Sequence, residues 1–266
     1  MDNKMDKKTL HHKLSEELIQ AERSRRPIAS LSARHPELSL DDAYQIQWLQ
    51  TAKAMKEGRR LIGYKVGLTG VEVRKQLKID QPDFGCLFSD RFVADGSEIS
   101  LGKLISPKIE GELAFVLAKD LKGPNITIAE AMSAVDYAMV ALEIVDSRIE
   151  NWKISAVDTI ADNGSSGYFV LGGQKSSLVN VDLGRLGLVL TRNQEVVSTG
   201  SGAAVLDNPM MALVFLANQL AKFGRELLAG QVIMTGAFSG LVPMAPQDII
   251  DCEIHRTGRV RVRCVP

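Results

Sequence analysis

Apolar residues recur along the chain with two different periods, and the period changes near residue 60. Before that point the spacing is helical and predicts two helices, over 9–24 and over 40–57. Ser39 and Asp42 have the spacing of a capping box, which marks the start of the second helix, and Gly58 follows its end. We therefore expect a small N-terminal helical lobe over residues 1–59 and a β-rich domain over residues 60–266.

Beyond residue 60 the chain has alternating or continuous apolar runs, which are typical of strands. Strands are predicted over 60–69, 107–117, 137–145, 168–171, 186–192 and 232–236, and on both sides of Thr257 and Gly258. Helices are predicted over 71–77, 126–135 and 207–224, a turn over 81–85 and a polar loop over 158–167. The last strand alternates arginines with apolar residues, which indicates the wet face of an edge strand. Together these runs predict a mostly β domain with surrounding helices.

Two glutamates, Glu110 and Glu112, lie in the middle of the apolar run 107–117. Side chains alternate across a strand, so the two carboxylates share one face, roughly 7 Å apart. An unpaired carboxylate in apolar surroundings is costly or takes up a proton. Glu143 lies in the same kind of surroundings in the run 137–145. Three such groups favour a hard cation, Mg²⁺ or Mn²⁺, with structural ion pairs to lysine or arginine as the alternative.

A lysine and an aspartate lie on the segments before these glutamates. Lys65 is flanked on its own face of the run 60–69 by Gly63 and Gly67, and the missing side chains leave space for a ligand beside the ammonium. A solvated lysine on an edge strand is the alternative. Asp83 lies in the predicted turn, where turn chemistry explains it. The polar loop 158–167 offers amides and hydroxyls to a ligand, or is a plain connector.

The composition argues against several classes of function. With 32 basic and 32 acidic residues the net charge is zero, so no general field attracts nucleic acid or an anionic membrane. The three cysteines and four histidines lack the spacings of a zinc site, and the histidines give no sign of a catalytic triad. The sequence has no signal-peptide pattern and no apolar run long enough to cross a membrane. We expect a cytoplasmic protein with a small-molecule ligand.

Five motifs occur in an order that matches a known family. They are GYKVGLT at 63–69, QPDFG at 81–85, PKIEGELAFVL at 107–117, LEIVDSR at 142–148 and DTIADNGSSGYFVLG at 158–172. In this combination the chain resembles the 2-keto-4-pentenoate hydratases of catechol meta-cleavage pathways, within the fumarylacetoacetate hydrolase superfamily. The resemblance implies an α+β fold with a mixed β-sandwich or β-roll core and peripheral helices. It also implies a Mg²⁺ or Mn²⁺ cofactor and a homo-oligomer.

The resemblance gives roles to eight residues, motif by motif. These are Glu110, Glu112 and Glu143 as metal ligands, Lys65 and Asp83 as catalytic residues, and Ser165, Thr235 and Gly236 as substrate-binding residues. The implied enzyme is a hydro-lyase that adds water to 2-hydroxypenta-2,4-dienoate, or its 2-oxo tautomer, and gives 4-hydroxy-2-oxopentanoate.

Two alternatives to hydratase activity follow from the same residues. The sister activity is 4-oxalocrotonate decarboxylase, which the Ser165-Ser166-Gly167 stretch and residues 35–45 partly resemble. A pathway enzyme of the other kind, decarboxylase or hydratase, is a possible docking partner. The alternative from another class is a metal-stabilised binding protein without turnover. The cleared face around Lys65 argues against it, because a purely structural site needs no open cationic face.

Overall fold

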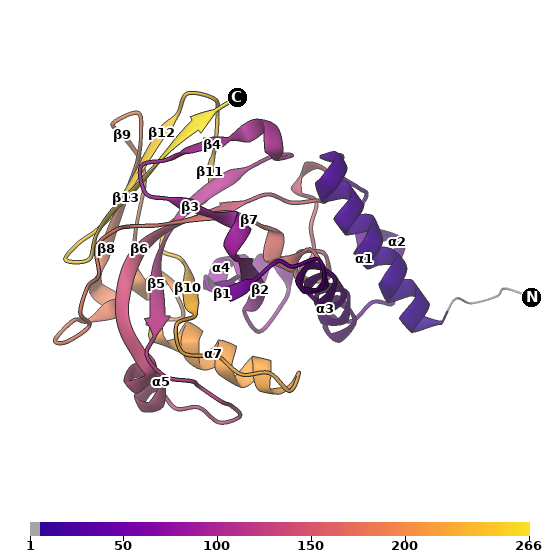
Figure 1. Cartoon of the computed structure of the whole chain (residues 1–266), viewed down its shortest axis with the longest axis horizontal. Coiled ribbons are helices and arrows are strands. Elements are labelled where there is room, and N and C mark those ends of the chain that lie inside the picture. The colour runs from indigo at the N-terminus through magenta and orange to yellow at the C-terminus, as the bar shows by residue number, and fades with distance from the viewer. Residues whose placement is uncertain (1–5) are drawn as a thin grey trace, which may run out of the picture.

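The protein, described here from a computed structural model over residues 6–266, has two β-sheets with helices around them (Figure 1). The helices of the described residues are α1 (Lys7–Ser24), α2 (Leu31–Arg34), α3 (Leu40–Lys56), α4 (Val71–Leu77), α5 (Ile128–Ala134), α6 (Ala156–Ala161) and α7 (Met210–Ala221). The first strands are β1 (Leu61–Gly67), β2 (Asp83–Phe88), β3 (Phe92–Ala94), β4 (Glu98–Ser100), β5 (Lys108–Leu117) and β6 (Val135–Val145). The others are β7 (Ser166–Leu171), β8 (Gly187–Arg192), β9 (Glu195–Ser201), β10 (Val232–Ala237), β11 (Val242–Pro243), β12 (Ile249–Ile254) and β13 (Gly258–Val265). The predicted α+β fold is confirmed.

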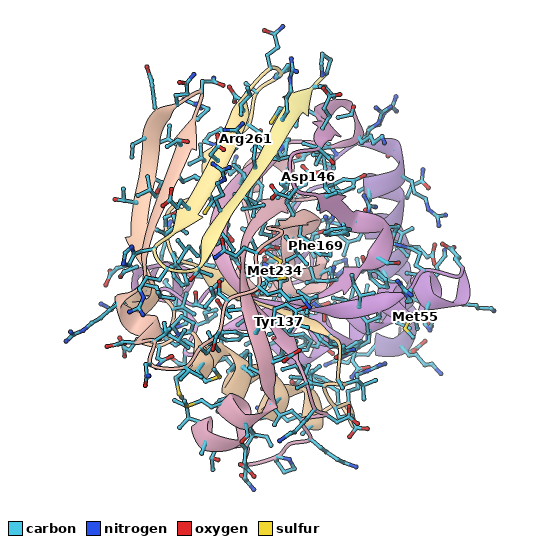
Figure 2. All side chains as sticks on the ribbon, turned by 60° about the vertical axis from the view of Figure 1, so that its left-hand side comes forward. Met55, Tyr137, Asp146, Phe169, Met234 and Arg261 are labelled. Atoms are coloured by element: carbon cyan, nitrogen blue, oxygen red, sulfur yellow. The ribbon has the colours of Figure 1, made fainter. Side chains whose placement is uncertain are left out.

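The larger sheet has the strand order β2-β1-β10-β5-β6-β7-β3, with β11 paired to β5. Its two longest strands, β5 and β6, lie at the centre and pair antiparallel over their length. Both are apolar on both faces because helices or strands cover both sides of them. Phe169 of β7 and Met234 of β10 lie in the middle of the molecule, whereas Met55 and Arg261 lie at its periphery (Figure 2).

The smaller sheet, in the order β4-β13-β12-β8-β9, packs on one face of the larger one. Gly111 of β5 makes this close approach possible, since a Cβ there would lie 2.7 Å from the sulfur of Cys252 and 2.8 Å from Leu188. The face of β5 that carries Gly111 is therefore sealed by the smaller sheet. Glu110 and Glu112 lie on the opposite face.

The N-terminal helices α1–α3 lie at one end of the molecule (Figure 1). The Ser39–Asp42 capping box of α3 is present as predicted. From α3, the Tyr44 ring stacks on Phe84 at 4.7 Å, and the buried Gln47 amide donates to the carbonyls of Phe84 and Ile160. The division of the chain at residue 59 stays a prediction, and these contacts cross it.

Three local predictions are wrong. The turn predicted over 81–85 is the start of strand β2, because Asp83 pairs with Gly67 at the end of β1. The first part of the predicted loop 158–167 is the end of helix α6, which Ser155 and Asp158 begin with a capping box, and strand β7 begins at Ser166. Strand β13 is not an edge, since it pairs with both β4 and β12, although its arginines are exposed as expected. Within residues 6–266 no helix has the length and apolar character needed to span a bilayer.

Candidate metal centre and active site

Strands β5 and β6 bring three glutamates together. In the antiparallel register Glu110 is opposite Glu143, and Glu112, two residues along β5, shares their face. One carboxylate oxygen from each lies within 4.8 Å of the other two. Glu112 and Glu143 are fully buried, and Glu110 is partly exposed. The convergence that the alternating pattern predicts is therefore present in the structure.

Lys65 and Asp83 lie beside this group of glutamates. The ammonium nitrogen of Lys65 lies 3.3 Å from Oε1 of Glu143, an ion-pair distance. Asp83 reaches the same place because β2 pairs antiparallel with β1. A Cβ at Gly67 would lie 2.3 Å from Oδ1 of Asp83 and 3.0 Å from the Lys65 nitrogen. Gly67 thus clears space for the Asp83 carboxylate and the lysine head group.

The role predicted for Gly63 is wrong. A Cβ at this position would lie 1.9 Å from the backbone oxygen of Val232. Gly63 therefore permits the parallel pairing of β1 with β10 and leaves no space for a ligand.

Many oxygens of these carboxylates have no hydrogen-bond partner. They are Oε1 of Glu112, both oxygens of Glu143 and both oxygens of Asp83. Leaving such atoms unsatisfied is costly, and one ammonium cannot satisfy or neutralise four carboxylates. A divalent cation held by the glutamates removes both problems, so the donor set fits a hard metal ion.

The pKa shifts of the site residues, taken without a metal ion, also favour a bound cation. Burial, together with the charge of Glu143, raises the pKa of Glu110 to about 8. Burial also raises the pKa values of Glu112, Glu143 and Asp83. Burial lowers the pKa of Lys65, but the charges of Glu143 and Asp83 outweigh it and hold that pKa above its usual range. The neighbouring carboxylates thus favour the charged form of Lys65.

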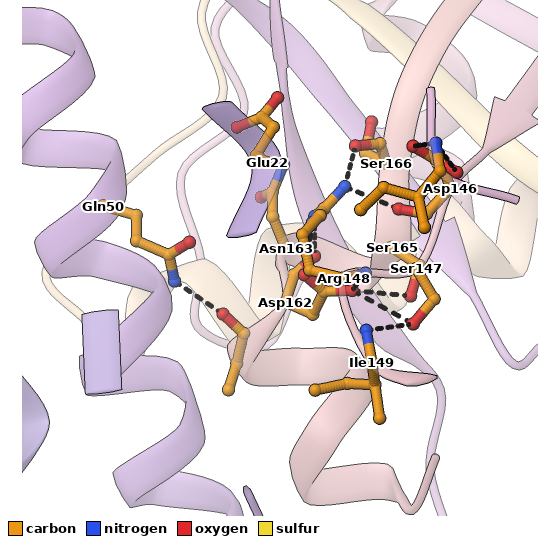
Figure 3. Close-up of polar contacts among 12 residues, drawn as sticks. Glu22, Gln50, Asp146, Ser147, Arg148, Ile149, Asp162, Asn163, Ser165 and Ser166 are labelled. Carbon is orange, nitrogen blue, oxygen red and sulfur yellow. Dashed lines mark hydrogen bonds and ion pairs between the residues drawn. The ribbon is translucent and has the colours of Figure 1, made fainter. Parts of the chain in front are cut away.

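Ser165 reaches the site on a short turn, Asn163–Ser165, that follows α6. Its hydroxyl donates to Oδ2 of Asp162 at 3.1 Å. The buried Arg148 holds this aspartate through an ion pair with its carboxylate, and also donates to the carbonyls of Asp162 and Ser166 (Figure 3). A Cβ at Gly164 would lie 3.2 Å from the side chain of Lys65. The Arg148–Asp162 pair thus fixes the turn that packs on the lysine.

Thr235 and Gly236 do not line the cavity. The hydroxyl of the buried Thr235 donates to the Leu113 carbonyl at 2.9 Å, and the Gly236 amide donates to Oε2 of Glu112 at 2.9 Å. Gly236 has φ +109, a conformation that favours glycine. These contacts orient Glu112, and a direct substrate contact for either residue stays a prediction without support from the cavity lining.

The site lies in a cavity of about 450 Å³. Four of the predicted site residues line this cavity, namely Lys65, Asp83, Glu110 and Ser165. Other lining residues, which include Leu68, Val73, Thr159, Trp152, Ile154 and Phe238, were not predicted. Leu68 and Thr159 lie within the motifs at 63–69 and 158–172, whereas the other four lie on segments without a distinctive motif, which only the fold brings to the cavity.

The motifs, the sheet and the glutamate group agree with the comparisons to known proteins. Residues 50–265 match the model of the fumarylacetoacetate (FAA) hydrolase C-terminal family. The chain belongs to this family. Its residues share 45% identity over 93% of the chain with the "2-keto-4-pentenoate hydratase" of Paraburkholderia xenovorans, of which 92% is covered. It is 40% identical to the "2-hydroxyhexa-2,4-dienoate hydratase" of Comamonas testosteroni, over 92% of this chain and 94% of that one.

A solved structure of the same fumarylacetoacetate hydrolase fold superposes over nearly the whole chain. It is the 4-oxalocrotonate decarboxylase from Pseudomonas putida G7, described in complex with magnesium and adipate. The TM-score is 0.95 at 36% sequence identity, and the match covers 99% of this chain and 100% of the decarboxylase. Hydratases and a decarboxylase are therefore both among the similar members of the fumarylacetoacetate hydrolase family.

Proposed function

We propose that the protein is a metal-dependent hydratase that adds water to 2-hydroxypenta-2,4-dienoate, or its 2-oxo tautomer, and gives 4-hydroxy-2-oxopentanoate. The observation that carries this proposal is the group of three glutamates, with oxygens within 4.8 Å of one another, beside Lys65 and Asp83. The 45% identity to a protein named as such a hydratase supports the same reaction.

The metal would be held by Glu110, Glu112 and Glu143, as Mg²⁺ or Mn²⁺. Their unpartnered oxygens are the ligands such ions prefer, and the Gly236 amide keeps Glu112 oriented. When bound, the ion supplies a Lewis acid that binds the substrate carboxylate and 2-oxygen and stabilises negative charge on them.

Lys65 and Asp83 supply the remaining charge and proton transfer. Transfer of the 2-hydroxyl proton to C5 first gives the 2-oxo-3-enoate, in which C4 is electrophilic. Lys65 is buried, and its ammonium stabilises the negative charge that develops on the 2-oxygen as water adds at C4. The Asp83 carboxylate accepts a proton from the attacking water and returns it to C3, which completes the addition and regenerates the carboxylate. Ser165 lines the cavity and contacts the substrate.

The test is to follow the loss of the conjugated dienol spectrum with and without added Mg²⁺, and to identify the product. We expect water addition by the wild type and loss of metal-dependent turnover in Glu110→Gln, with the circular dichroism spectrum unchanged. Glu253→Gln is the matched control, because this glutamate lies exposed on β12, outside the cavity lining. Normal turnover by Glu110→Gln contradicts the proposal.

A second candidate is decarboxylation of 4-oxalocrotonate, which the TM-score of 0.95 to the decarboxylase favours. The same polarised 2-oxygen serves as the electron sink for loss of CO₂. Incubation with 4-oxalocrotonate separates the two activities, because one releases CO₂ and the other does not. If Mg²⁺ raises the thermal stability but no 2-oxo acid binds, the protein is instead a metal-stabilised binding protein.

The family resemblance also supports two proposals about assembly. We propose that the chain forms a homo-oligomer and that a pathway decarboxylase or hydratase docks on it. Light scattering gives the number of copies, and elution together with a purified partner enzyme tests docking.

A further inference from the structure

Asp83 lies on strand β2, which is the last strand at one edge of the larger sheet. The inner edge of β2 pairs with β1, which carries Lys65. The backbone groups on the outer edge of such a strand need other partners. Within residues 6–266 no strand pairs with the outer edge of β2, and side chains from α3 and from the turn after α6 contact it instead. The position of Asp83 therefore depends on these side chains.

The first of these side chains is Gln47, which lies on α3 and is fully buried. Its amide nitrogen donates to the carbonyl of Phe84 at 2.8 Å and to the carbonyl of Ile160 at 3.1 Å. Phe84 directly follows Asp83 on β2, and Ile160 directly follows Thr159 on α6. One side-chain nitrogen thus links the two segments that bring Asp83 and Thr159 to the cavity.

The second side chain is Asn163, in the turn that carries Ser165. Its oxygen accepts a hydrogen bond from the Cys86 amide at 2.7 Å, and its nitrogen donates to the Cys86 carbonyl at 3.0 Å. The turn lies so close to β2 that a Cβ at Gly85 would be 2.3 Å from the backbone oxygen of Asn163. Asn163 therefore holds the turn against β2, whereas Gln47 holds α6 against the residue next to Asp83.

The spacing between β2 and α6 matters because Thr159 lies near the Asp83 carboxylate. Burial raises the pKa of Asp83, and the charge of Lys65 and the hydroxyl of Thr159 oppose this rise. Both neighbours thus favour the charged form of Asp83, which is the form that can accept a proton from water. The effect of a hydroxyl weakens steeply when its distance or angle changes, so a shift of α6 relative to β2 reduces it.

Helix α3 is a firm support for Gln47. One turn before Gln47, the buried Tyr44 ring stacks on the Phe84 ring of β2, with the ring centroids 4.7 Å apart. One turn after it, the Gln50 amide donates to the Ala161 carbonyl of α6 at 2.7 Å (Figure 3). Contacts on both sides of Gln47 thus fix its backbone relative to β2 and to α6.

We propose that Gln47 is a positioning residue, which holds β2 and α6 at a fixed spacing and thereby places the Asp83 carboxylate beside Lys65. This inference rests on the proposed function, in which Asp83 transfers the proton. It makes the N-terminal helices part of the active-site structure, because Gln47 precedes the residues 50–265 that match the family model. Without the Gln47 amide, two buried carbonyls lose a donor and β2 loses a contact on its outer edge.

The first test compares kcat with KM. Methionine is close to glutamine in size but has no amide, so Gln47→Met should lower kcat for the dienoate by about tenfold or more, as a shift of the Asp83 carboxylate requires. KM and the Kd for Mg²⁺ should change by less than about twofold, because the three glutamates lie on β5 and β6. A loss of stability alone would leave kcat per folded molecule unchanged. Wild-type kcat in Gln47→Met overturns the proposal.

Gln50→Met is the matched control. It removes an amide from the same helix and a contact with α6, but no contact with β2. We expect its kcat to stay within about twofold of the wild type, because the link to the residue next to Asp83 remains. Equal falls in kcat in the two variants overturn the assignment to Gln47, because they would show that any loosening of α3 from α6 is sufficient.

The second test follows the strand itself and needs no turnover. We expect amide hydrogen exchange over Asp83–Phe88 to be faster by about tenfold or more in Gln47→Met, and unchanged in Gln50→Met. Unchanged exchange in Gln47→Met overturns the proposed link. Gln47→Asn keeps an amide but is shorter by one methylene, so it should give the same two results. If neither Gln47 variant folds, the residue serves the core alone and the proposal is wrong.

Turnover by the wild type separates this inference from the proposed function. If the wild type hydrates 2-hydroxypenta-2,4-dienoate and Gln47→Met is equally active, only the inference fails. If the wild type hydrates no dienoate but β2 exchanges faster in Gln47→Met, the proposed function fails and the link between Gln47 and β2 is supported.

Discussion

Replacing Gly67 with alanine tests the geometry of Lys65 and Asp83, the proposed catalytic pair. The new Cβ would lie 2.3 Å from Oδ1 of Asp83, and ordinary contact begins at 3.4 Å. The carboxylate therefore has to move by about 1.1 Å, because the backbone of the paired strands β1 and β2 cannot yield as readily. A misplacement of about 1 Å costs roughly a hundredfold in rate. We expect Gly67→Ala to lower kcat by about that factor.

The fold and the metal site give independent readouts for this variant. The clash is with a side chain that borders a cavity, and alanine restricts the unfolded chain, so we expect the free energy of unfolding to change by less than about 1 kcal/mol. The glutamates are untouched, so Mg²⁺ affinity and KM for the dienoate change little.

The assay is the initial rate of dienol loss at saturating Mg²⁺, with urea unfolding measured on the same samples. Gly187→Ala is the matched control, since Gly187 is also a strand-terminal glycine and a Cβ there meets nothing within 4 Å. A Gly67→Ala enzyme with more than half of the wild-type kcat refutes the placement of Asp83 in the reaction. A fall in stability of several kcal/mol refutes the assumption that the clash stays local.

Three further predictions test other parts of the structure. Removal of Mg²⁺ with a chelator should lower the melting temperature, because a ligand at 100 times its Kd stabilises the folded protein by about 2.7 kcal/mol. We expect this shift in melting temperature to disappear in Glu110→Gln, and an equal shift in that variant would contradict the proposed metal site. Arg148→Met leaves the buried Asp162 carboxylate without its ion-pair partner, so urea unfolding should show that the free energy of unfolding falls by about 3–5 kcal/mol. Arg192→Met is the control, because Arg192 lies at the partly exposed end of β8 and its replacement should change the free energy of unfolding little. Burial raises the pKa of Asp42, but hydrogen bonds from Ser39 and Lys7 outweigh burial and lower this pKa. The Asp42 carboxylate therefore stabilises the fold above its unfolded pKa of 3.8, and this stabilisation is lost as the pH falls. Asp42→Ala should therefore cost about 1 kcal/mol at pH 7, and the difference from wild type should shrink below about pH 4; a pH-independent difference contradicts this.

The glutamates could be predicted from the sequence because the signal is local. A carboxylate every second residue in an apolar run places the charges on one buried face, and the register of β5 with β6 then puts Glu110 opposite Glu143. The capping box of Ser39 and Asp42 is equally local. Such patterns depend on a few neighbouring residues, so the local structure that they predict does not depend on contacts with distant segments.

The rest of the site depends on contacts between distant segments. Asp83 was predicted in a turn because Gln81-Pro82-Asp83 has turn composition, yet pairing with β1 makes it a strand residue. Helix α6 was missed although Ser155 and Asp158 have capping-box spacing, a signal that could have found it. The role of Gly63 could not be predicted, because it depends on the backbone oxygen of Val232, which lies far away in the sequence.

The distribution of the active-site residues between strands and connecting segments has a consequence for divergence. The three glutamates proposed to hold the metal lie on the two central strands of the larger sheet, where substitution disturbs the core. Other residues that line the cavity, such as Val73, Trp152 and Ile154, lie on connections and on the short helix α4, which tolerate change. Mutation of these connections can thus change the shape of the cavity while the group of glutamates on the central strands is retained.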